Sequence, residues 1–131
     1  MKKFFDYHYY RVAKFNFKRE GTHAFSALLS VTSVQLLALL NLFLFFESLF
    51  SHHEARKLFL YEKISFLLVF LVLLFINYKT YKKKYFEFRE QWRHESKKMY
   101  IINGAIVILT IILSWSLIFL NAYIFGRYRI Y

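Results

Sequence analysis

The chain contains no cysteine and no proline, and only three of its 131 residues are glycine. Without cysteine it can form neither disulfides nor thiolate-ligated zinc or iron–sulfur sites. No stretch rich in proline, or in glycine and serine, separates one part of the chain from another, so we expect a single membrane domain over residues 1–131.

Acidic residues are also scarce, with eight Asp and Glu against nineteen Lys and Arg. Paired catalytic carboxylates, a Walker loop, a dinucleotide-binding fingerprint and a nucleophile elbow are all missing. We therefore predict a protein that is not an enzyme, with no catalytic residue and no cofactor. His52, His53 and Glu54 suggest a metal at first sight, but adjacent histidines do not share a helical face. We expect a boundary loop there and no metal site.

Charge is absent from two long stretches, residues 24–46 and 100–125, and hydrophobic residues make up 58% of the chain. A helix rises 1.5 Å per residue, so each stretch can cross a hydrocarbon layer of about 30 Å. A third span over residues 58–78 brings Glu62 and Lys63 near the membrane surface, where they can reach headgroups. We predict an all-α integral membrane protein with three transmembrane helices.

The basic residues alternate from one side of these spans to the other. Lys and Arg number six before the first span, three between the first and second, eight between the second and third, and two after the third. Because cytoplasmic loops carry the excess of Lys and Arg, we predict a cytoplasmic amino terminus, an external carboxyl terminus and location in the cytoplasmic (inner) membrane. Attraction to an anionic lipid bilayer explains the cations without nucleic-acid binding. The expected lipid contacts are Lys82, Lys83, Lys84, Lys97 and Lys98.

Two basic, aromatic segments flank the spans on the predicted cytoplasmic side. Residues 2–20 are predicted to form a helix in the headgroup layer, which suits both aromatic rings and cations. Residues 79–96 are predicted to form a second amphipathic helix, and Thr22 and Ser96 are predicted to cap the spans that follow them. Four aromatic residues on one face of that second helix are predicted either to dock a partner or to rest on lipid or on residues 2–20: Tyr81, Tyr85, Phe88 and Trp92.

Small polar residues recur at helical spacing inside the first and third spans. Both spans run outward, so equal numbers of residues reach equal depths, and Asn41 and Asn121 are predicted to lie at the same level. These polar residues either join the helices by hydrogen bonds or line a path for ions or water in an oligomer. They are Ser26, Ser30, Ser33, Asn41, Asn103, Thr110, Ser114 and Asn121.

Arg89 and His94 form the pattern R-x4-H. This pattern resembles the catalytic motif of HEPN-type ribonucleases, and the resemblance covers six residues. It implies a nuclease site formed between two helical chains, in a segment that is otherwise a basic amphipathic helix.

Three spans bury little surface against one another, so we expect association with further copies of the chain or with a larger membrane protein. We predict a non-catalytic subunit or adaptor of a larger membrane complex. The alternative is a homo-oligomeric pore or a membrane-permeabilising protein of the holin or effector type. A tethered ribonuclease or transferase is the third hypothesis.

Overall fold

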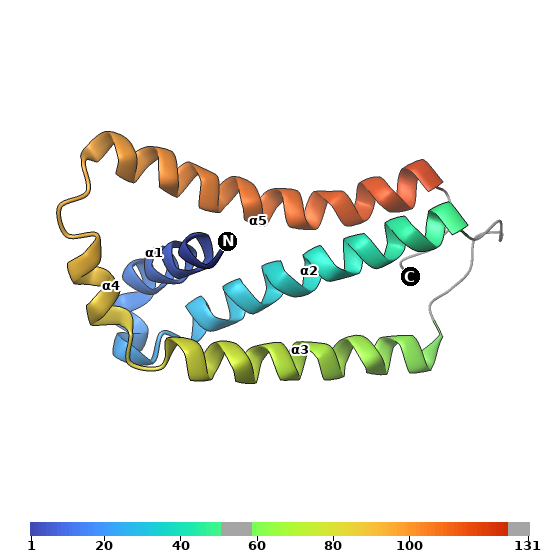
Figure 1. Ribbon diagram of the computed structural model, residues 1–131, viewed down its shortest axis with the longest axis horizontal. Helices are drawn as coiled ribbons and strands as arrows, with labels where there is room; N and C mark the ends of the chain where they lie inside the picture. Colours follow the sequence, from blue (N-terminus) through green and yellow to red (C-terminus); the bar gives the residue numbers. More distant parts are fainter. Residues whose placement is uncertain (51–58, 126–131) are drawn as a thin grey trace.

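The computed structural model describes residues 1–50 and 59–125, which form five α-helices and one short 3-10 helix (Figure 1). Three of these helices are long and apolar enough to cross a membrane, which confirms the three predicted spans and indicates a multi-pass membrane protein. In chain order the elements are α1 (Lys2–Glu20), η1 (Gly21–His23), α2 (Phe25–Phe50), α3 (Leu60–Tyr81), α4 (Tyr85–Gln91) and α5 (Lys97–Phe125).

The spans α2, α3 and α5 overlap the predicted ranges 24–46, 58–78 and 100–125. The predicted cap of the third span is confirmed, because the Ser96 hydroxyl accepts a hydrogen bond from the Met99 N–H at 3.3 Å. Length and hydropathy were therefore sufficient to locate the helices that can cross a bilayer.

The prediction of one amphipathic helix over residues 79–96 is wrong. α3 ends at Tyr81, the backbone turns through Lys83 with a φ of 62°, and α4 has only seven residues. Residues 92–96 are not helical. The turn takes the chain off the axis of α3 and brings Tyr85 and Phe88 against α1, which a straight continuation of α3 would not do.

A tight corner joins α1 to α2. Gly21 has a φ of 57°, which glycine adopts without steric cost, and its N–H donates to the Phe17 carbonyl. The Glu20 carboxylate accepts from the Ser26 N–H at 2.9 Å and from the Ser26 hydroxyl at 2.5 Å, and these bonds lower the pKa of Glu20. The capping bond predicted for Thr22 is thus supplied by Glu20 instead.

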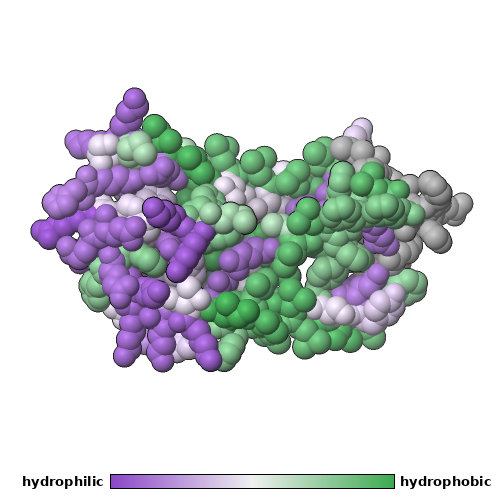
Figure 2. Space-filling view, in the orientation of Figure 1, coloured by the Kyte–Doolittle hydropathy of each residue, from purple (hydrophilic) through white to green (hydrophobic). Residues whose placement is uncertain are grey.

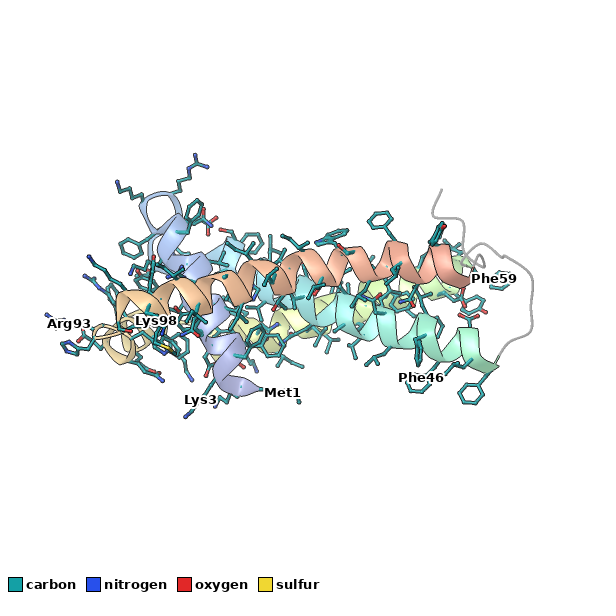
Figure 3. The ribbon with its side chains drawn as sticks, turned by 90° about the horizontal axis from the view of Figure 1, so that it is seen from above. Met1, Lys3, Phe46, Phe59, Arg93 and Lys98 are labelled. Atoms are coloured by element: carbon teal, nitrogen blue, oxygen red, sulfur yellow. The ribbon has the colours of Figure 1, made fainter. Side chains whose placement is uncertain are left out.

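α2 is the central span, with α5 packed along one side of it and α3 along the other (Figure 1). α1 crosses these spans at one end, where it packs against α2 and α4. Lys3, Arg93 and Lys98 lie at this end, and Phe46 and Phe59 lie at the opposite end (Figure 3).

Hydrophilic residues gather at the end that carries α1, and hydrophobic residues cover the spans (Figure 2). We call this part the basic end; it consists of residues 1–23 and 79–99, with fourteen Lys and Arg against five Asp and Glu. A cluster of buried hydrophobic side chains lies where the basic end meets the adjoining turns of the spans, while Val34, Leu37 and Leu44 are buried further along α2. The cluster comprises Tyr7, Tyr9, Tyr10, Ala13, Ala24, Ala27, Leu28, Val31, Tyr81, Tyr85, Phe88 and Val107.

An amide side chain joins α3 to α2 inside the apolar region. Asn77 of α3 is buried and donates to Thr32 Oγ1 at 3.0 Å and to Gln35 Oε1 at 2.7 Å. Lipid tails are as apolar as leucine, so hydrophobicity gives little attraction between spans, and such hydrogen bonds help to hold them together.

A second amide pair joins α2 to α5. Asn41 donates to the Ser114 carbonyl at 3.2 Å, and Asn121 donates to Asn41 Oδ1 at 3.1 Å. The prediction that Asn41 and Asn121 lie at equal depth is confirmed. Hydrogen bonds therefore connect the central span to both of its neighbours.

Replacing Asn77 by leucine should lower the free energy of unfolding by about 1–3 kcal/mol, because each lost interhelical hydrogen bond is worth about 0.6–2 kcal/mol. The thermal midpoint in mild detergent, followed by circular dichroism, measures this loss. Ser65→Ala is the matched control, since the Ser65 hydroxyl donates to the Tyr61 carbonyl of its own helix and, among the described residues, to no other helix. An Asn77→Leu variant as stable as the wild type would contradict the assignment.

Candidate functional site at the basic end

Aromatic side chains of α1 interlock with those at the end of α3 and in α4. Tyr9 stacks on Tyr81 with 4.5 Å between ring centroids, and Phe17 stacks on Tyr85 at 4.9 Å. Each such pair contributes about 0.5–1.5 kcal/mol beyond the area it buries. We call this group the aromatic cluster; its members are Tyr7, Tyr9, Tyr10, Phe17, Tyr81, Tyr85, Phe88 and Trp92.

The aromatic stripe predicted to dock a partner or lipid is not an open surface. Tyr81, Tyr85 and Phe88 are buried, and Trp92 is half-buried and packs edge-on against Tyr7 at 5.1 Å. Of the arrangements considered from the sequence, the structure has the one in which the stripe rests on residues 2–20. The docking prediction is corrected accordingly, because the chain's own α1 covers these rings.

α1 is helical over residues 2–20, as predicted. The sequence predicted that this helix would rest in the headgroup layer, but part of it is enclosed by protein. Four consecutive residues, Tyr7 to Tyr10, are buried, and Ala13 is 1% exposed. Consecutive residues point to different sides of a helix, so this half of α1 contacts protein around most of its circumference.

A carboxylate at the basic end links α1 to α5. The Tyr7 hydroxyl donates to both oxygens of Glu95 at 2.9 and 3.0 Å, and Asn103 donates to Glu95 Oε1 at 2.7 Å. Burial and the hydrogen bond with Glu95 raise the pKa of Tyr7 to about 12, so the phenol stays protonated and keeps donating. Asn103, predicted to join spans or line a path, thus helps to bind α1.

A buried histidine links α1 to α2. His8 is 0% exposed, and its Nε2 lies 2.8 Å from Ser30 Oγ, while no partner in the described chain reaches its Nδ1. Burial lowers the pKa of His8 to about 4, so the ring is neutral at pH 7. Ser30 and Ser26, both predicted to face other spans or a path, instead bond α1 residues His8 and Glu20.

Arg11 lies flat against the start of α5. Its guanidinium carbon is 3.5 Å from the centroid of the Tyr100 ring, a cation–π contact. A Cβ at position 104 would clash with Nη2 of this guanidinium, so Gly104 leaves the room that Arg11 occupies. Nη1 is buried and has no hydrogen-bond partner in the described part of the chain.

The remaining polar residues of the spans make local contacts. Thr110 and Ser114 donate to the carbonyls of Ile106 and Thr110, one turn back in α5. Ser33 is half-buried. Asn41, Ser114 and Asn121 are brought together, as described above, whereas Ser26, Ser30 and Asn103 serve the contacts of the basic end.

The predicted lipid-contacting lysines and the R-x4-H pair lie at the surface of the basic end. Lys82, Lys83, Lys97 and Lys98 are exposed and Lys84 is partly so, while Arg89 and His94 are exposed on α4 and in the turn after it. Within residues 1–50 and 59–125 no group of three His, Cys, Asp or Glu could hold a metal ion. His52, His53 and Glu54 lie outside the described residues.

Sequence reasoning did not identify Asn77, His8, Glu95 or Arg11 as structural residues. Asn77 had a usable signal, because it is the only amide side chain in the second span. The partners of His8, Glu95 and Arg11 lie on other helices, and no sequence spacing relates them.

Tyr9→Ala should release α1 from the aromatic cluster, because removing a buried ring typically costs about 3–5 kcal/mol. The absence of native cysteine allows a clean probe: Ala13→Cys, buried in the docked state, should react with maleimide much faster in the Tyr9→Ala background. Phe15→Ala is the control, since Phe15 is on the same helix and 88% exposed. Equal labelling rates in both backgrounds would show that Tyr9 does not hold α1.

Docking of α1 should weaken as pH falls from about 6.5 towards 4. The docked His8 has the lowered pKa, so over this range released α1 binds a proton that docked α1 does not, and docking is fully stable above the range. Maleimide reacts with the thiolate, whose population itself falls as the pH falls. The effect is therefore measured as the labelling rate of Ala13→Cys divided by that of Phe15→Cys, an exposed position on the same helix, over this pH range. His8→Gln should flatten the profile, and an unchanged profile would mean that another group titrates.

No protein-family model matches this sequence, and no curated protein or solved structure is significantly similar to it.

Proposed function

We propose that this protein is a non-catalytic subunit or adaptor of a larger membrane complex. The observation that carries the proposal is the unequal covering of its spans. α2 is packed on both sides, whereas α3 and α5 leave long apolar faces uncovered; Leu68 is 58% exposed and Leu113 is 55% exposed. These outer faces are the surfaces on which helices of a larger membrane protein would pack.

Small residues on the two outer faces support this assignment. Ser65 on α3 and Ala105 on α5 are exposed. Small side chains let helix backbones approach closely, which is how helices associate in lipid without a hydrophobic driving force. The surfaces first predicted for docking are used within the chain, so the partner contact is reassigned to these faces.

The charge distribution supports an orientation with the basic end in the cytoplasm of the cytoplasmic membrane. Fourteen Lys and Arg lie at that end and five lie elsewhere in the chain. Of the lysines at this end, Lys84 is partly exposed and the others are exposed, which is compatible with the proposed contact with anionic headgroups. The aromatic cluster orders this end, so its cations form a defined surface for lipid or for a partner's cytoplasmic part.

A pore lined by the predicted polar residues is a less well supported alternative. Asn41 and Ser114 are each 8% exposed, and the side chain of Asn41 and the carbonyl of Ser114 are hydrogen-bonded to each other. Groups that satisfy one another between two helices are not available to solvate ions. The nuclease hypothesis rests on Arg89 and His94 alone, and no contact among the residues that the structure describes brings a further catalytic group to them.

A photoreactive amino acid placed at Leu68 or at Leu113, on the outer faces, should form adducts in cells with a larger membrane protein. The same group at Val31, which is 0% exposed, should form none and is the matched control. Adducts are resolved by mass after mild-detergent purification. Adducts only at multiples of the 16.1 kDa chain would favour the homo-oligomeric alternative, and no protein adducts at either position would overturn the subunit proposal.

A further inference from the structure

We propose that a groove between α1 and α5 binds one anionic phospholipid, with its phosphate on Arg11 and an acyl chain along α5. This inference requires only that the three spans lie in a bilayer. It is independent of the subunit role, so either proposal can fail without the other.

The groove has a volume of about 280 Å³. Among the described residues that line it, Arg11 is the charged one and the others are apolar. Arg11 stands at the head of the groove. Along α5 the lining residues Gly104, Ile108 and Ile111 follow one helical stripe that leads from Arg11 into the span. Gly104 is buried beneath Arg11 and Ile111 is half-buried, while Ile108 is 60% exposed, so the stripe is open to lipid at Ile108.

Arg11 has the features of a cation that lacks its anion. Nη1 is buried and without a hydrogen-bond partner, and among the described residues no carboxylate lies within salt-bridge distance of it. Glu95, the carboxylate that binds the neighbouring Tyr7, is already engaged by Tyr7 and Asn103. Arg11 is half-buried, and a buried N–H group without an acceptor is costly. A phosphate supplies both the charge and the geometry to which the planar fork of a guanidinium binds.

A second cation contacts the same aromatic ring as Arg11, although it does not line the groove itself. Lys14 Nζ is 5.1 Å from the centroid of the Tyr100 ring on which Arg11 also lies. Two cations favour an anionic headgroup over a zwitterionic one. Tyr100 stands in the first turn of α5, where aromatic side chains typically mark the boundary between headgroups and hydrocarbon.

The apolar continuation decides in favour of a lipid as the occupant. An acidic peptide or a nucleic acid could pair with Arg11 and Lys14, but neither would use an apolar stripe that runs down a membrane-spanning helix. A phospholipid satisfies both parts, with its phosphate at the cations and its chain against Ile108 and Ile111.

The test uses the full chain in a neutral detergent, titrated separately with phosphatidylglycerol, phosphatidylcholine and inorganic phosphate. A ligand that binds the folded protein raises the thermal midpoint in proportion to its affinity. Phosphatidylglycerol should raise the midpoint at concentrations at which the other two ligands have little effect. Arg11→Gln should weaken the apparent affinity for phosphatidylglycerol about tenfold, and Lys18→Gln, an exposed cation of α1 outside the groove, should not.

A second variant separates binding from folding. Gly104→Ala displaces the Arg11 guanidinium while leaving the sequence of α1 unchanged, so it should reproduce the loss of affinity seen with Arg11→Gln. It provides the deciding measurement if Arg11→Gln does not fold. Variants that keep the wild-type response to phosphatidylglycerol would overturn the site. An equal response to inorganic phosphate would show an anion site without lipid specificity, and an equal response to phosphatidylcholine would remove the role of the cations; either would refute the proposal.

Discussion

The packing of α1 between the ends of the spans is the interaction on which the rest of this structure depends. Its rings fill the core, and its polar groups reach every span or its flanking turn: His8 bonds Ser30 of α2, Tyr9 stacks on Tyr81 of α3, and Tyr7 bonds Glu95 just before α5. A buried polar group without a hydrogen-bond partner costs free energy. Docking of α1 brings these groups to their partners together, and this offsets the cost of burying them.

The position of the core follows from the solvent. Removing aromatic surface from water stabilises a fold by roughly 25 cal/mol per Å², but removing it from lipid tails does so far less. The aromatic cluster therefore forms at the basic end, where water and headgroups are near, and not at mid-span. Deeper in the spans, Asn77 and Asn41 supply the cohesion, since a hydrogen bond retains its strength where the hydrophobic effect is absent.

Some polar and apolar groups of the spans find their partners within the chain, and others do not. Four polar side chains of α2 are hydrogen-bonded to neighbouring helices and so leave little for an ion path: Ser30, Thr32, Gln35 and Asn41. α3 and α5 keep uncovered apolar faces, and Arg11 keeps a buried nitrogen that has no acceptor in the described part of the chain. A partner helix and an anionic lipid are the two components whose chemistry matches those unfilled contacts.

The sequence by itself determined the three spans, the asymmetry of charge and the common depth of Asn41 and Asn121. Each of these depends only on length, composition or the constant rise of a helix along one chain. Tertiary structure decided that α1 is enclosed, that the chain breaks near Lys83, and that Ser30 faces His8 and not another span. Aromatic rings and cations suit a headgroup layer as well as a protein interior, so the pattern in residues 2–20 fits both locations. Only the packing of α1 against helices that are distant in sequence decides between them.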